Sequence, residues 1–285
     1  MQPKTPIHPS QSMEKMQEVI DLVREVHGFD LSCFDETFFG QSLQKRQSAT
    51  ATVTIEEYLE LLQQRPTEAK NLLESMNVVY SEFFRNPLAF TLLEQVLLPE
   101  IFDEKEKSGG EIRVWSTGCA TGQEAWSAAI LLDEMVGMRN RPLSYRIIAS
   151  DRSESALAQA RTGRYHIDTM GSLKTRYMRN AFSRRGDYFT VVPRLRQKVT
   201  FTVYDLLDTE TFCPPESIFG NFDLVFCCNI LFYYRQAVQA SVLKKIRRCL
   251  APSGYLITDA TERRIVEESS GFRASTPPAA VFQRQ

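Results

Sequence analysis

The stretch of this 285-residue chain that is most informative about chemistry joins an apolar strand to a helix through small residues. It reads Val-Trp-Ser-Thr-Gly-Cys-Ala-Thr-Gly-Gln-Glu over residues 114–124. Small residues in such a turn let the backbone approach a ligand closely, as in nucleotide-binding folds. The turn lacks the Gly-x-Gly-x-x-Gly pattern, and Glu124 places a carboxylate where a dinucleotide enzyme binds pyrophosphate. The pattern therefore favours a cationic ligand such as S-adenosylmethionine, and a turn that serves packing alone is the alternative.

Two aspartates follow neighbouring strands of the same region. Asp151 ends the apolar run 147–150, a position from which a carboxylate can accept hydrogen bonds from ribose hydroxyls. Asp205 follows the run 201–204 and is placed to contact an adenine edge. Either aspartate could instead cap a helix. Together with the glycine turn, the pair predicts a nucleoside site.

The elements that must position these residues alternate between strand and helix from residue 111 onward. Strands are predicted at 111–116, 145–150, 199–204, 222–228 and 255–259, and helices at 123–135, 154–161 and 237–250. This alternation predicts an α/β fold with a mostly parallel sheet and helices on both faces. The ligand of such a sheet lies at the carboxyl ends of its strands.

The first part of the chain carries helical patterns and nothing strand-like. Apolar residues recur at helical spacing from Met13 to Val26 before Gly28, and residues 1–12 are polar and expected to be disordered. A second helix begins after Thr54, and Pro66 interrupts it before a third that we expect Thr67 to cap. We predict an all-helical domain of four short helices over 1–78, with Lys45 and Arg46 on a loop or a polar face, and a second domain over 79–285.

Residues 168–198 interrupt the strand and helix alternation. They form a basic stretch around an expected hairpin at 185–187, which we interpret as an inserted subdomain. A solvated hairpin face and a docking surface for an acidic partner are both compatible with this charge. Its basic residues are Lys174, Arg176, Arg179, Arg184, Arg185, Arg194, Arg196 and Lys198.

Composition excludes several classes of protein. With 43% apolar residues, a net charge of -1 and a sequence pI near 6.4, the chain is neither disordered nor broadly basic, so nucleic acid is not an expected partner. We expect no membrane insertion and a cytoplasmic monomer, since no secretory signal or spanning segment is present. Six scattered cysteines and three distant histidines predict reduced thiols and no metal site.

Four motifs in order resemble the CheR-type chemotaxis receptor protein-glutamate O-methyltransferase family. The family's hydroxyl residue before Phe-Phe-Arg is matched at 81–85, and its Gly-Cys-x-Thr-Gly-x-Glu turn at 118–124. Its aspartate-to-tyrosine block is matched at 151–165 and its Phe-Asp block at 222–233. The resemblance implies a Rossmann-like class I S-adenosylmethionine-dependent methyltransferase domain, an all-helical N-terminal domain and a small antiparallel β subdomain insert. Cys228, Val79 and Asp259 depart from the family, which has Arg, Asn and Gly there.

The resemblance also implies a reaction and its residues. A glutamate carboxylate of a chemoreceptor (a methyl-accepting chemotaxis protein) would take the methyl group of S-adenosylmethionine, with Arg85 and Tyr233 as catalytic residues and Phe83 and Phe84 as core. The partners would be glutamate-rich cytoplasmic receptor helices, and some family members use the β subdomain to bind a receptor C-terminal peptide. The implied cofactor-binding residues are Ser81, Arg85, Gly118, Glu124, Asp151, Asp205, Leu206, Asn229 and Ile230.

Two other functions are compatible with the sequence. The departures at Cys228 and Val79 allow an S-adenosylmethionine-binding interaction protein with weak or no activity. The basic insert allows an RNA methyltransferase, which the pI and the lack of interleaved surface aromatics oppose.

Overall fold

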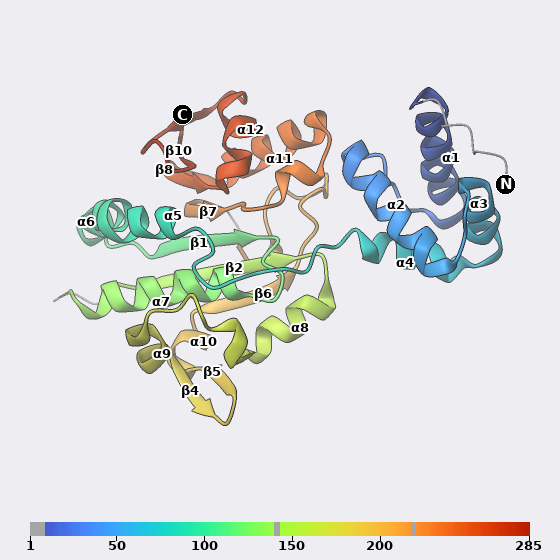
Figure 1. Cartoon of the computed structure of the whole chain (residues 1–285). Helices are drawn as coiled ribbons and strands as arrows, with labels where there is room; N and C mark the ends of the chain where they lie inside the picture. Colours follow the sequence, from blue (N-terminus) through green and yellow to red (C-terminus); the bar gives the residue numbers. More distant parts are fainter. Residues whose placement is uncertain (1–8, 140–142, 218–219) are drawn as a thin grey trace. The chain divides into compact units, whose positions relative to one another are not determined.

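A computed structural model of the chain describes residues 9–139, 143–217 and 220–285 (Figure 1). The chain divides into two compact units, Met1–Val78 with Phe232–Gln236, and Val79–Leu231 with Ala237–Gln285. The predicted disorder of residues 1–8 lies outside the described residues. Residues 9–12 are helical, so for them the prediction of disorder is wrong.

The described residues of the first unit form four helices, as the sequence predicts: α1 (Pro9–His27), α2 (Glu36–Thr50), α3 (Ile55–Gln64) and α4 (Pro66–Ser75). Thr54 caps α3 in a reciprocal capping box with Glu57. The prediction that Thr67 caps α4 is wrong, because α4 begins one residue earlier at Pro66. Proline suits that first position since its fixed φ is helical and its missing N–H has no partner to lose there.

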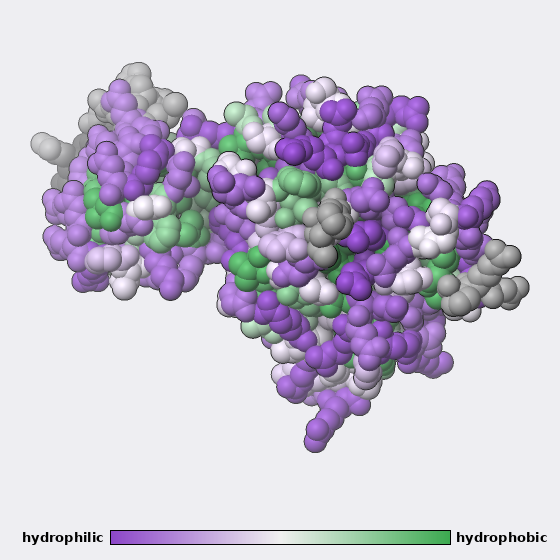
Figure 2. Space-filling model, turned by 180° about the vertical axis from the view of Figure 1, so that it is seen from behind, coloured by the Kyte–Doolittle hydropathy of each residue, from purple (hydrophilic) through white to green (hydrophobic). Residues whose placement is uncertain are grey.

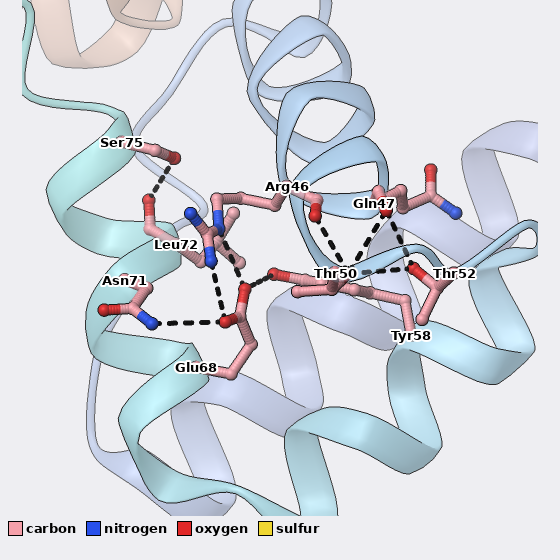
Figure 3. Close-up of polar contacts among 9 residues, drawn as sticks. All are labelled: Arg46, Gln47, Thr50, Thr52, Tyr58, Glu68, Asn71, Leu72 and Ser75. Carbon is pink, nitrogen blue, oxygen red and sulfur yellow. Dashed lines mark hydrogen bonds and ion pairs between the residues drawn. The ribbon is translucent and has the colours of Figure 1, made fainter.

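The interior of this unit holds an ion pair that the sequence did not reveal (Figure 3). The Arg46 guanidinium of α2 donates from Nε and Nη2 to the two Glu68 oxygens of α4, at 2.9 and 2.8 Å. Tyr58 of α3 donates to the same carboxylate at 2.8 Å. Burial disfavours the charge, yet the hydrogen bonds from Arg46 and Tyr58 hold the pKa of Glu68 below its ordinary value. The expectation that Arg46 lies on a loop or polar face is therefore wrong.

A seven-stranded sheet forms the centre of the second unit, in the order β6-β2-β1-β7-β8-β10-β9. The first five strands are parallel, which confirms the predicted sheet, whereas β10 and β9 are antiparallel additions that the sequence analysis missed. The strand bounds are β1 (Ile112–Thr117), β2 (Tyr145–Asp151), β6 (Val199–Val203), β7 (Phe222–Phe226), β8 (Leu250–Ile257), β9 (Phe272–Ala274) and β10 (Val281–Arg284).

Helices cover both faces of this sheet (Figure 1). Consecutive strand residues accordingly belong to two separate cores: Val114 and Ile147 pack on one side, and Trp115 and Ile148 on the other. A strand buried on both faces reads as a continuous apolar run, which is why these strands were recognisable in the sequence. The helices of this unit are α5 (Pro87–Leu92), a π-helical turn η1 (Leu93–Leu97), α6 (Leu98–Ser108), α7 (Gln123–Gly137), α8 (Glu154–Thr162), α9 (Thr175–Ala181), α10 (Pro193–Arg196), α11 (Gln236–Cys249) and α12 (Arg263–Glu267).

A second, three-stranded antiparallel sheet forms the small β subdomain. Its order is β3-β5-β4, from Arg164–His166, Tyr188–Val191 and Phe182–Arg185. Gly186 has a φ of +61° in the turn between β4 and β5, so the predicted hairpin is confirmed. The sheet begins four residues before the predicted insert, because β3 pairs with β5.

Hydrophilic residues cover most of the face shown in Figure 2, and hydrophobic residues form small spots among them. Within the described part of the chain, no helix combines the length and the apolar character that a membrane crossing requires.

Arg46→Ala should destabilise the helical unit by about 1–3 kcal/mol, because it leaves the buried Glu68 carboxylate without its charged donor. Lys45→Ala is the matched control: Lys45 is the exposed neighbour on the same helix, and its loss should change stability by less than about 0.5 kcal/mol. Urea unfolding followed by circular dichroism measures both variants. Equal midpoints for the two variants would show that the ion pair contributes nothing.

Candidate active site

The turn between β1 and α7 has a backbone that requires small residues. Gly118 and Gly122 have φ values of +55° and +91°, a region that L side chains rarely adopt. A Cβ at Gly118 would lie 2.6 Å from Cδ1 of Ile230, and one at Gly122 would lie 2.9 Å from Cβ of Ala160. The glycines therefore serve both the turn and the close packing of the segments around it.

Glu124 lies in the first turn of α7 and accepts a hydrogen bond from Ser116 Oγ at 2.6 Å. Burial raises the pKa of its carboxyl to about 7, and the nearby charge of Glu262 acts in the same direction. The hydrogen bonds from Ser116 and Cys228 and the charge of Arg85 oppose that rise. A partly buried carboxylate with a raised pKa is stabilised by any cation that binds beside it.

Glu262 is a structural residue beside the site that the sequence analysis did not single out. Its buried carboxylate accepts the backbone N–H groups of Asn229, Ile230 and Leu231 at 2.8, 2.6 and 2.7 Å, and Thr258 Oγ1 donates at 2.7 Å. Burial raises the pKa of this carboxyl, and these donors oppose the rise. Its sequence signal was the Asp-x-x-Glu pattern of a capping box, which Asp259 and Glu262 form.

These segments line one cleft, with about 520 Å³ of empty space. Five residues predicted for the site meet there: Ser81, Arg85, Gly118, Glu124 and Asn229. They come from the segment before α5, the turn after β1, the start of α7 and the loop after β7. The other lining residues are Tyr80, Glu82, Asn86, Ala89, Phe90, Cys119, Cys228, Phe226, Ile257 and Asp259.

Other predicted cofactor residues lie outside this lining. Asp151 accepts the N–H of Ala120 at 2.9 Å and so joins the end of β2 to the glycine turn. Asp205 is exposed and accepts the N–H of Leu207 at 2.9 Å, whereas Leu206 is buried in the core beside β7. Ile230 packs over Gly118. Cofactor contacts stay predictions for all nine residues, for those that line the cleft as well as for these four.

Arg85 projects from a segment that two phenylalanines anchor. Phe83 is fully buried, with ring contacts to Tyr165 and Phe182, and Phe84 stacks on Tyr177 with 4.9 Å between ring centroids. The interpretation of both phenylalanines as core residues is confirmed. Arg85 itself is exposed, and no ion pair to it occurs among the described residues.

Tyr233 belongs to the other compact unit. Its ring packs against Phe38 of α2, with 4.6 Å between centroids. The predicted domain 79–285 includes this tyrosine, but packing groups residues Phe232–Gln236 with the N-terminal helices. Its catalytic role stays a prediction.

The basic stretch 174–198 is less available than its charge suggests. Lys174 and Arg176 form ion pairs with Glu94, and Arg194 pairs with Asp133. Because acidic residues of the same chain pair with these three cations, the positive surface is smaller than the number of basic residues in the stretch predicts. Arg179 and Arg185 are exposed, and neither has an acidic partner within the described part of the chain.

The family model of the CheR methyltransferase, SAM binding domain, matches residues 80–277. The chain belongs to the CheR methyltransferase family. It is therefore a methyltransferase whose cofactor is S-adenosylmethionine, and the resemblance of its four motifs is confirmed.

Curated relatives agree with this family. Chemotaxis protein methyltransferase 1 of Pseudomonas aeruginosa is 32% identical over 211 residues, which cover 71% of this chain and 74% of that protein. The chemotaxis protein methyltransferase of Escherichia coli is 27% identical, over 86% of this chain and 83% of its own. An uncharacterized 104.1 kDa protein of Rhodobacter capsulatus is 28% identical over 97% of this chain, which spans 28% of that larger protein.

The three departures from the CheR pattern have different structural settings. Cys228 lines the cleft, and its single S–H lies within reach of two acceptors, the Glu124 carboxylate and the Ile257 carbonyl, the latter at 3.6 Å. Asp259 caps the turn before α12 by accepting the N–H of Thr261 at 3.0 Å. Val79 is 47% exposed and is not part of the cleft lining. Of the three, Cys228 is therefore the change that most directly alters the surroundings of Glu124.

Glu262→Gln should destabilise the chain by about 1–3 kcal/mol, because an amide presents donors to backbone N–H groups that need acceptors. Amide hydrogen exchange at residues 229–231 should accelerate. Glu267→Gln is the matched control, since Glu267 is partly exposed and pairs only with Arg263 among the described residues. It should change stability by less than about 1 kcal/mol. Unchanged exchange at 229–231 in the Glu262 variant would contradict the role of this carboxylate.

Proposed function

We propose that this protein methylates glutamate side-chain carboxylates of chemoreceptors and gives glutamate methyl esters in chemotaxis adaptation or a related signalling pathway. Two observations support the proposal. Relatives of similar length are named chemotaxis protein methyltransferases. The cleft also combines the Glu124 carboxyl group with Arg85, a cation that forms no ion pair within the described residues. Glu124 suits a cationic cofactor, and Arg85 suits an anionic acceptor.

The residues that line the cleft fit S-adenosylmethionine. When bound, it supplies an electrophilic methyl group on a sulfonium. Glu124 offers a carboxylate to its positive charge, and Gly118 offers backbone without a side chain. Ser81 and Asn229 add polar groups at the same surface. Asp151 would serve the ribose; for Asp205, Leu206 and Ile230 the cofactor contacts rest on the sequence motifs.

The acceptor requires orientation more than activation. A glutamate with a pKa of about 4.3 is already ionised near neutrality, so no general base is needed. Near-attack positioning can lower a barrier by about 7–11 kcal/mol. The Arg85 guanidinium can hold one carboxylate through two parallel hydrogen bonds while leaving a lone pair free for the methyl group. Tyr233 is the second residue for which we propose contact with the acceptor or the cofactor.

The substrate would be the glutamate-rich helices of a receptor's cytoplasmic region. Arg179, Arg184 and Arg185 lie exposed on α9 and the β4 hairpin strand, where they give the β subdomain a local positive charge. Such a charge raises the encounter rate with an acidic partner, and salt screens this effect.

The two alternative functions are less well supported. The hypothesis of an RNA methyltransferase depends on the basic stretch 174–198. Several cations of that stretch form ion pairs with acidic residues of the same chain. The hypothesis of a binding protein without activity depends on the departures at Cys228 and Val79. These departures do not affect Arg85, Glu124 and Asn229, which still line the cleft.

The proposed substrate is tested by incubating the protein with labelled S-adenosylmethionine and receptor-containing membranes of the same organism. We expect label in the receptor, released as volatile methanol by base, as a carboxyl methyl ester requires. Label that is stable to base, or label recovered in RNA, would refute the proposed function.

Arg85→Ala should lower kcat/KM for receptor methylation by at least about tenfold, since charge-assisted hydrogen bonds of roughly 1.5–3 kcal/mol are lost. Cofactor affinity should fall much less. Arg85→Lys should recover little, because an ammonium cannot hold both oxygens in one plane. Arg264→Ala removes an exposed arginine of α12 that does not line the cleft, and it should leave turnover unchanged. Turnover of Arg85→Ala within a few-fold of wild type would remove Arg85 from acceptor binding.

Cofactor affinity should fall as the pH drops through about 7, because Glu124 then takes up a proton and loses the charge that a sulfonium uses. The loss should approach about tenfold per pH unit below that value if the ionised form alone binds. Calorimetric titration on both sides of this pH measures it. Glu124→Gln should bind more weakly above it and show a flatter profile. Parallel pH profiles for the two proteins would contradict the role of the charge.

A further inference from the structure

Four polar residues of one short segment line the cleft together. They are Tyr80, Ser81, Glu82 and Arg85, whereas Phe83 and Phe84 pack against the core. Phe84 has a φ of +50°, and its N–H donates to Ser127 Oγ at 2.9 Å, so the backbone of this turn is held in place. The segment therefore presents its polar side chains on the side opposite to its aromatic anchors.

The Arg85 guanidinium lies over the ring of Tyr80, with 5.2 Å between Cζ and the ring centroid. The Tyr80 hydroxyl donates a hydrogen bond to the Glu82 carboxylate. A guanidinium that stacks on a ring uses its face, and the N–H groups along its edge stay available for a carboxylate. An ion pair to an internal acid would instead occupy those donors, and Arg85 has none among residues 9–139, 143–217 and 220–285.

We propose that Tyr80 is a positioning residue for methyl transfer: its ring holds the Arg85 guanidinium ready for the acceptor carboxylate. This inference rests on the proposed role of Arg85. An arginine side chain loses considerable rotamer freedom when it binds. A stacking partner that restricts the side chain beforehand reduces that loss, which favours acceptor binding without contacting the substrate.

The Tyr80 side chain contributes little to the packing of the fold. Its side chain is 55% exposed, so its removal opens no core cavity, in contrast to that of the buried Phe83. A variant at this position should therefore fold, and its kinetics should report on Arg85.

The test compares Tyr80→Leu, Tyr80→Phe and the control Val79→Ala, whose side chain is the exposed neighbour in the sequence. Tyr80→Leu should lower kcat/KM for receptor methylation by about two- to fivefold, the range of a cation–π contact at an exposed site. The dissociation constant for S-adenosylmethionine and the melting temperature should stay unchanged. Tyr80→Phe keeps the ring, so its kcat/KM should stay within twofold of wild type. The kcat/KM of Val79→Ala should also stay within twofold, because substitutions of exposed residues usually have small effects.

A double-mutant cycle separates positioning from other effects. In an Arg85→Ala background, Tyr80→Leu should have no further effect, because the group that it positions is absent. An equal effect in both backgrounds would overturn the proposal, as would a Tyr80→Phe variant as impaired as Tyr80→Leu. The experiments distinguish failure of the proposed role of Arg85 from failure of the proposed role of Tyr80. Full turnover by Arg85→Ala refutes the role of Arg85. Lost turnover in Arg85→Ala together with wild-type turnover in Tyr80→Leu refutes the role of Tyr80 alone.

Discussion

The hydrogen bonds to the buried Glu262 carboxylate shape the wall of the cleft. The N–H groups of three successive residues after β7, the hydroxyl of Thr258 and the N–H of Asp259 all point to this side chain. A carboxylate buried without such donors would be strongly unfavourable. The same donors lock the loop in which Asn229 has a φ of +60° and from which Ile230 reaches over Gly118. The loop after β7 and the turn after β1 are thereby joined.

This structural carboxylate also influences the functional one. Glu262 lies close enough to Glu124 to raise its pKa, while Arg85 acts in the opposite direction. Two neighbouring carboxyl groups favour a cation beside Glu124. The arrangement therefore links the loop after β7 to the charge that surrounds Glu124. It is compatible with the cationic cofactor of the CheR methyltransferase family.

Some basic side chains of the chain form internal ion pairs, and others stay available at the surface. Arg46 neutralises Glu68 inside the helical unit, and Lys174 and Arg176 pair with Glu94 beside the β subdomain. Arg85 differs from these because its neighbour is the ring of Tyr80, which leaves its donors available. Which cations can bind a partner is therefore decided by local packing, and counting basic residues overestimates the docking surface.

The sequence by itself determined the parallel sheet and the glycine turn, because strands buried on both faces are continuous apolar runs and positive φ values favour glycine. It also determined that Phe83 and Phe84 belong to the core. Only the tertiary structure decided that Arg46 is turned inward, that β9 and β10 extend the sheet, and that Glu262 holds the loop of Asn229. These features depend on partners that lie far apart in the chain, and no local pattern records such pairings.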